Sequence, residues 1–123
     1  MKISIITPCL NAETSIARAI ESVREQNYKN WEHIIVDGGS TDGTLAILAK
    51  YPHLKVRSGP DAGQADAMNK GIEMASGDII SFLNADDYYF PEAFLKVAEA
   101  FDDQTDFVVG NVLVKSKRLT PSS

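Results

Sequence analysis

Short apolar runs alternate with amphipathic helical patterns along the chain, and this alternation restricts the fold more than any other feature. Five runs have the length and apolar content of strands; they span residues 3–7, 31–37, 54–57, 79–83 and 106–114. Each interval between two runs contains apolar residues at helical spacing, joined by short connections. Such an order forms parallel sheets covered by helices. The sequence therefore predicts a doubly wound, mostly parallel α/β sheet with helices on both faces.

Three details of this sheet follow from local patterns. The run at residues 79–83 is nearly all apolar, as in strands buried on both faces, so we expect it to be the central strand. Pro8 should end the first strand, because proline lacks the N–H that a ladder uses. In the helix expected after residue 63, Ile72 should lie on the apolar side and Asp66 on a polar face.

Composition limits the class of protein. The 123 residues, 44% of them hydrophobic, fit one domain spanning residues 1–123. The 17 acidic residues outnumber the 12 basic ones, and the basic run at 115–118 fits a solvated strand end better than a nucleic-acid site. The single cysteine, Cys9, excludes an internal disulfide and a cysteine-based zinc site. Without a signal-peptide pattern or an apolar run of about 20 residues, we expect a soluble cytoplasmic protein that binds no nucleic acid.

Polar residues gather directly after three of the predicted strands, at residues 8–13, 37–42 and 84–87. Ligands of parallel α/β sheets bind at the carboxyl ends of the strands. In an extended chain Asn84 and Asp86 point to the same side, so together they could hold a hard cation such as Mg²⁺ or Mn²⁺. The simpler reading is that these aspartates cap a helix or stand in solvent.

The loop that begins at Asp37 is open to two readings. It lacks the lysine of a P-loop and the spacing of a dinucleotide fingerprint. An aspartate at a strand end can instead accept hydrogen bonds from a base or a ribose. A glycine turn in which Asp42 caps the next helix explains Ser40 and Asp42 equally well.

Four blocks of sequence, in order, are similar to the family-2 glycosyltransferases of the GT-A fold, and to the bacterial branch that builds surface polysaccharides and O-antigens. The blocks are residues 5–11, 35–44, 66–72 and 77–87. The resemblance implies transfer of a sugar, with inversion, from a nucleotide-diphosphate sugar, usually a uridine diphosphate sugar. It also implies a glycan or lipid-linked acceptor and a divalent metal, Mg²⁺ or Mn²⁺.

The resemblance also implies roles for particular residues. It implies that the uracil pocket is lined by Thr7, Pro8 and Leu10 and that Glu13 contacts the nucleoside. It brings Asp37 to the base or ribose and Asp66 to the nucleotide or sugar. The family's Asp-any-Asp motif falls on Asn84, Ala85 and Asp86, with Asp86 as the metal ligand and Asn84 as its weaker partner.

The chain departs from the family pattern at three places. Gly38 stands where many relatives have a second aspartate, so base recognition should depend on Asp37 or on backbone groups. Asn84 replaces the first aspartate of the metal motif and supplies less negative charge. No residue before Ser123 can be assigned as the general base that inverting transfer needs, so the chain resembles the donor-binding part of an enzyme.

Two kinds of function remain open from the sequence. One is an inverting, metal-dependent glycosyltransferase that associates peripherally with a membrane as a full-length enzyme. The other is a non-catalytic module that binds a nucleotide or nucleotide sugar. A receiver-type signalling domain fits less well. The apolar strand expected at residues 106–114 would expose an edge in the isolated chain, which predicts a homodimer.

Overall fold

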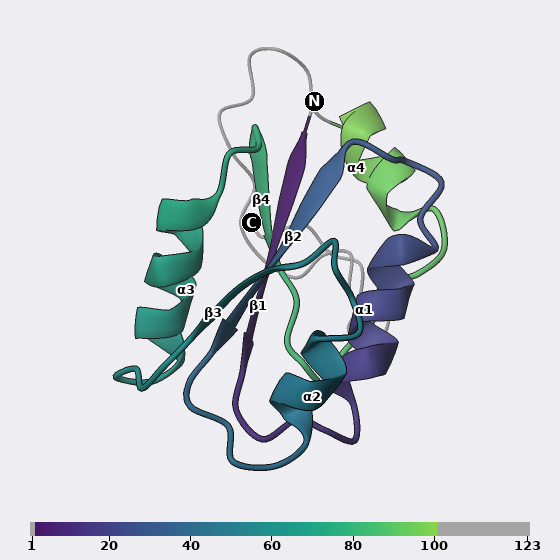
Figure 1. Ribbon diagram of the computed structural model, residues 1–123. Helices are drawn as coiled ribbons and strands as arrows, with labels where there is room; N and C mark the ends of the chain where they lie inside the picture. Colours follow the sequence, from purple (N-terminus) through teal and green to yellow (C-terminus); the bar gives the residue numbers. More distant parts are fainter. Residues whose placement is uncertain (1, 101–123) are drawn as a thin grey trace.

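The computed structural model describes residues 2–100, which form a four-stranded parallel sheet in the order β3-β2-β1-β4 (Figure 1). The strands are β1 (Ile3–Cys9), β2 (Trp31–Asp37), β3 (Lys55–Ser58) and β4 (Ile79–Phe82). Every pairing in this sheet is parallel. The predicted α/β class is confirmed. The strand expected at 106–114, and with it the basis for a dimer, lies outside the described residues.

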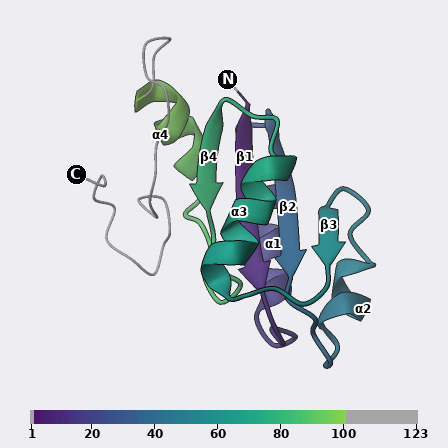
Figure 2. The same ribbon diagram turned by 90° about the vertical axis from the view of Figure 1, so that its left-hand side faces the viewer.

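Four helices cover the two faces of the sheet. They are α1 (Ile16–Arg24), α2 (Thr44–Leu48), α3 (Gln64–Met74) and α4 (Ala93–Ala100). Figures 1 and 2 show α3 on one face and the other three on the opposite face. The buried clusters agree, since Ala67 of α3 packs with Ile6 and Ile34, whereas α1 and α4 pack together over Ile3 and Ile5. None of the helices in the described part is long and apolar enough to cross a membrane.

Helix α3 approaches the sheet unusually closely. A Cβ at Gly71 would lie 2.4 Å from Cγ2 of Ile6, so only glycine allows this separation. Ala67 and Gly71 are buried, but Ile72 is 46% exposed, so the prediction that Ile72 faces the core is wrong. The buried positions of α3 are therefore the small residues Ala67 and Gly71.

Strand β1 continues through Pro8 to Cys9, so the prediction that Pro8 ends it is also wrong. The carbonyl of Ile6 accepts a hydrogen bond from Leu83 N, whereas that of Cys9 accepts one from Gly38 N. Since alternate residues of a parallel strand face the same neighbour, the nitrogen of Pro8 faces the β4 side. Pairing with β4 ends at Phe82, opposite Ile6, so no ladder bond is lost at Pro8.

Within the described sheet, β4 lies at an edge and β1 and β2 lie at the centre. Because the strand expected at 106–114 lies outside the described residues, the central place of residues 79–83 stays a prediction. Only one face of β4 is fully covered. Ile79 and Ser81 are buried, but Ile80 and Phe82 are partly exposed. The apolar sequence of β4 therefore reflects coverage by helices on one side and partial coverage on the other.

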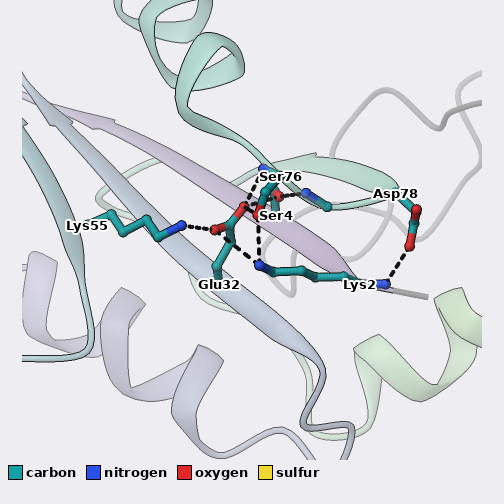
Figure 3. Close-up of polar contacts among 7 residues, drawn as sticks. Lys2, Ser4, Glu32, Lys55, Ser76 and Asp78 are labelled. Carbon is teal, nitrogen blue, oxygen red and sulfur yellow. Dashed lines mark hydrogen bonds and ion pairs between the residues drawn. The ribbon is translucent and has the colours of Figure 1, made fainter.

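The buried carboxylate of Glu32 ties four segments together at the amino end of the sheet (Figure 3). It accepts hydrogen bonds from Ser4 Oγ (2.6 Å), from the backbone N of Ser76 (2.6 Å) and from Ser76 Oγ (3.0 Å). Lys55 Nζ donates to its other oxygen, and Lys2 Nζ lies 3.5 Å away. The cluster joins β1, β2 and β3 to the connection between α3 and β4.

Candidate functional site

A cavity of about 490 Å³ opens at the carboxyl ends of the strands. It lies where the strand order reverses, since the chain moves from β1 to β2 and β3 on one side and places β4 on the other. Loops after β1, β3 and β4 line it. The lining residues are Pro8, Cys9, Leu10, Asn11, Ala12, Thr14, Ser15, Asp61, Gly63, Gln64, Ala67, Asn84, Ala85 and Asp86. Such a switch point is the usual ligand site of open α/β sheets.

Five of the nine residues that the sequence indicated for this site line the cavity, namely Pro8, Leu10, Asn84, Ala85 and Asp86. The others, Thr7, Glu13, Asp37 and Asp66, do not contribute to its described lining. Thr7 is fully buried and its Oγ1 lies 2.7 Å from His33 Nε2. Burial, with a smaller effect from His53, lowers the pKa of His33 to about 3, so this imidazole is neutral at physiological pH.

The segment after β4 forms a turn rather than the extended chain assumed from the sequence. Asp87 N donates to the carbonyl of Asn84 at 3.0 Å, and Asn84 Oδ1 accepts a hydrogen bond from Gln64 Nε2 at 3.0 Å. Asp86 is exposed on the cavity, whereas Asp87 is 5% exposed and does not line it. The turn nevertheless brings Asn84 and Asp86 to one cavity, as predicted, and turns Asp87 away.

The carboxylate of Asp37 is enclosed within its own loop. Its oxygens accept hydrogen bonds from Gly39 N (3.0 Å), Ser40 N (2.9 Å) and Ser58 Oγ (3.0 Å), and also from the side chains of Ser40 and Cys9. Burial acts to raise the pKa of Asp37, but these hydrogen bonds outweigh it and hold the pKa below its usual value. Asp37 is therefore ionised, and its hydrogen bonds hold the loop after β2 in place.

The loops after β1 and β2 are clasped by Asn11. Its backbone is left-handed, with φ of 52°, and its Oδ1 accepts hydrogen bonds from Thr41 N (2.8 Å) and Asp42 N (3.2 Å). The neighbouring Ala12 N donates to Thr44 Oγ1 at 2.8 Å. These bonds fix the cavity wall that follows β1.

Glu13 and Asp66 serve local structure. Glu13 Oε1 accepts a hydrogen bond from Gly43 N at 3.3 Å, which adds to the clasp between the two loops. Asp66, in the first turn of α3, accepts one from Ala62 N at 3.0 Å and pairs with Lys70 at 3.2 Å. Both carboxylates therefore shape the loops around the cavity.

Asp61 and Gln64 line the cavity but were missed in the sequence. They follow β3, whose end was not among the three strand ends considered in the sequence. Its segment 58–63 is rich in turn and polar residues, as those three ends are. Cys9 also lines the cavity, but burial, reinforced by Asp37, raises the pKa of its thiol to about 12. The thiol is therefore protonated and a poor nucleophile.

The donor chemistry of the cavity suits a hard cation held in part by its ligand. Asp86 offers an exposed carboxylate and Asn84 an amide oxygen, whereas residues 2–100 contain no group of three or more histidine, cysteine, aspartate or glutamate side chains that could hold a metal. Mg²⁺ and Mn²⁺ sites that bind phosphates commonly use one or two protein oxygens and complete the shell with phosphate and water. The residues present fit such a site.

The fold and the cavity define an α/β protein with a ligand site at the topological switch point. The family model described as Glycosyl transferase family 2 matches residues 4–122, and the chain belongs to this family. The PGL/p-HBAD biosynthesis glycosyltransferase of Mycobacterium tuberculosis is 35% identical over 121 residues, covering 92% of this chain and 47% of that protein. The chain thus spans about half the length of this curated relative.

Two solved structures resemble the described fold. S. aureus TarS 1–349, in complex with UDP-GlcNAc, gives a TM-score of 0.75 at 34% identity, over 85% of this chain and 32% of the TarS 1–349 chain. The mannosyltransferase PcManGT from Pyrobaculum calidifontis, in complex with GDP-Man and Mn²⁺, gives 0.77 at 25% identity, over 84% and 33%. The resemblance to family-2 glycosyltransferases of the GT-A fold is confirmed.

Proposed function

We propose that this chain binds the donor of an inverting glycosyltransferase, which transfers a sugar from a uridine diphosphate sugar to a glycan or lipid-linked acceptor in polysaccharide biosynthesis. The observation that carries this proposal is the cavity at the switch point, which is lined by Pro8 and Leu10 and by the Asn84–Asp86 turn. Its volume falls in the range of small-molecule sites. UDP-GlcNAc bound to TarS supports the donor class.

The lining of the cavity offers both kinds of surface that such a donor needs. Leu10 is 60% exposed and lines the cavity, so it offers an apolar surface on which a base could lie. Asp86 also lines the cavity, and its charge would repel a diphosphate directly. We therefore assign the base to the Pro8–Leu10 wall and the diphosphate, with its cation, to the Asn84–Asp86 turn.

A divalent cation would be held by Asp86 and by the amide oxygen of Asn84. When bound, it neutralises the charge that develops on the departing diphosphate. PcManGT in complex with Mn²⁺ supports a divalent metal. Asn84 must release Gln64 or share its oxygen with it, because Gln64 Nε2 donates to that oxygen in this structure.

Inverting transfer requires an acceptor hydroxyl to attack the anomeric carbon from the face opposite the diphosphate while a general base removes its proton. The described lining of the cavity contains two carboxylates, Asp61 and Asp86, and no histidine. Asp86 is assigned to the cation. We therefore assign the base to none of residues 2–100. A second candidate is a module that binds the donor without transferring its sugar, since the described lining offers a donor site.

Further parts of the proposal concern the whole protein. We place it in the cytoplasm, where a lipid-linked acceptor would bring it to the membrane surface peripherally. Self-association to a homodimer is also proposed, and sedimentation of the full chain tests it. Transfer of radiolabelled sugar to a lipid-extract acceptor separates the enzyme from the binding module.

Calorimetric titration with UDP, with and without Mn²⁺, tests the donor site. We expect binding that Mn²⁺ strengthens, and Asp86→Asn should remove that dependence on the metal. Asp78→Asn is the matched control, because Asp78 precedes β4 at its other end and bonds the backbone of Lys2. Absence of nucleotide binding under both conditions would contradict the proposal, and metal dependence that survives in Asp86→Asn would show that another residue holds the cation.

A further inference from the structure

Gly38, at the start of the loop after β2, leaves space that the carboxylate of Asp61 occupies. A Cβ at position 38 would lie 2.9 Å from Oδ2 of Asp61 and 3.2 Å from its Oδ1. Real Cβ atoms essentially never show a contact below 3.0 Å, so any side chain at residue 38 would displace the carboxylate. Gly38 and Asp61 therefore form one feature, in which one residue lacks a side chain and another fills its place.

Asp61 lines the cavity, and one of its two carboxylate oxygens has no hydrogen-bond donor among the described residues. Asp61 lies in the loop between β3 and α3. Its Oδ1 accepts a hydrogen bond from Gly63 N at 3.1 Å, which holds the side chain in place. Its Oδ2 accepts no hydrogen bond from any of residues 2–100. The protein thus orients the carboxylate through Oδ1 and leaves Oδ2 without a hydrogen-bond donor from residues 2–100.

The other carboxylates near this end of the cavity are not available. Asp37 is 1% exposed, and both of its oxygens already accept hydrogen bonds within its own loop. Asp42 accepts hydrogen bonds from Thr44 and Glu13 backbone groups and does not line the cavity. Apart from Asp86, Asp61 is the one carboxylate that the described residues present to a ligand there.

We propose that Oδ2 of Asp61 accepts a hydrogen bond from the nucleoside half of the donor, from an N–H of its base or an O–H of its ribose. An ionised carboxylate only accepts, so its partner must be a donor, and it repels a diphosphate. A nucleoside supplies such donors. This inference rests on the proposed function and adds a residue that selects the nucleoside, beside Asp37, whose two oxygens already accept hydrogen bonds.

Asp61→Asn is the informative substitution. Its amide oxygen can still accept the bond from Gly63 N, so the loop is preserved, while the free acceptor becomes a donor. In calorimetry with Mn²⁺, we expect UDP, or GDP if the wild-type chain prefers it, to bind roughly 10- to 100-fold more weakly. The corresponding nucleoside monophosphate should lose the same factor. Asp78→Asn, at the far end of the sheet, serves as the control.

Gly38→Ala tests the same idea from the other loop. The added methyl group displaces only the end of a side chain, so the variant should fold and melt like the wild type. Binding of the nucleotide should nevertheless weaken, because the carboxylate moves. The exchange variant Gly38→Asp/Asp61→Gly returns a carboxylate to this space and should recover most of the affinity that Asp61→Gly loses.

The outcomes separate this inference from the proposed function. Wild-type affinity in Asp61→Asn, with Mn²⁺-dependent binding intact in the parent chain, overturns the role of Asp61 and leaves the donor site standing. A loss seen with the diphosphate but not with the monophosphate overturns it too, because Asp61 would then act on the metal or the diphosphate. Failure of the parent chain to bind UDP or GDP overturns both.

Discussion

Replacing Glu32 by glutamine should destabilise the fold by an amount that depends on pH. The substitution keeps the shape of the side chain but removes its charge and turns one acceptor into a donor. Ser4 Oγ and Ser76 N donate to Oε2, and the two lysines lie at Oε1, so in either orientation of the amide the new NH2 group faces donors. The lysines can move away from it, because Lys2 and Lys55 are partly exposed and return to water.

The magnitude follows from the pKa of Glu32. Burial acts to raise it, but hydrogen bonds from Lys55, Ser4 and Ser76 outweigh burial and lower it from 4.5 to about 2. A carboxylate whose pKa is lower in the folded chain than in the unfolded chain stabilises the fold at pH values above its unfolded-state pKa. The difference corresponds to about 3 kcal/mol at pH 7, and this is lost as the pH falls from 4.5 towards 2.

Urea denaturation followed by circular dichroism at several values of pH measures this. We expect Glu32→Gln to lower the free energy of unfolding by about 3 kcal/mol at pH 7 and the gap to narrow below pH 4.5. Glu73→Gln is the control, since the exposed Arg57–Glu73 pair, at 3.8 Å, should contribute less than about 0.5 kcal/mol. A gap below about 1 kcal/mol at pH 7, or one that stays constant down to pH 3, would refute the reasoning.

Three further predictions concern the sheet and the cavity. Gly71→Val should destabilise the fold by about 2 kcal/mol or more in the same assay, because a Cβ there meets Ile6 at 2.4 Å; an unchanged midpoint would show that α3 can move away. Asn11→Gly should keep the left-handed backbone yet weaken UDP binding, because the bonds to Thr41 and Asp42 are lost; calorimetry measures it, and unchanged affinity would contradict the clasp. Cys9 should react slowly with iodoacetamide at pH 8, because its pKa is about 12, and a rate matching that of free cysteine would contradict this.

Local patterns were sufficient to locate most elements of the fold. The run at residues 31–37 matches β2 in full, and the apolar stripe of Ile16, Ile20 and Val23 is the buried side of α1. In these segments the spacing of the apolar residues matches the buried positions, because each segment packs directly against the core. Where the sequence erred, at Pro8 and Ile72, the outcome depended on a neighbour, namely the point where β4 ends and the closeness of α3 to β1.

The sequence likewise predicted one part of the candidate site and missed another. Strand ends rich in polar residues predicted the cavity and the place of Asn84 and Asp86 in it, because parallel strands carry their loops to one edge of the sheet. The sequence could not distinguish a carboxylate that is free to bind a ligand from one whose hydrogen bonds hold a loop together. Asp37 and Asp61 both follow strands, and only the packed loops show that the first is enclosed by hydrogen bonds while the second keeps a free oxygen.

The sequence by itself determined the order of strands and helices, the edge of the sheet where the cavity opens and the family to which the chain belongs. These depend on local period, turn residues and short motifs. The tertiary structure alone decided which carboxylates are free, that Asp61 occupies the space beside Gly38, and that Glu32 joins four segments. The physical reason is that a carboxylate's role is set by the donors around it, and these donors come from distant parts of the chain.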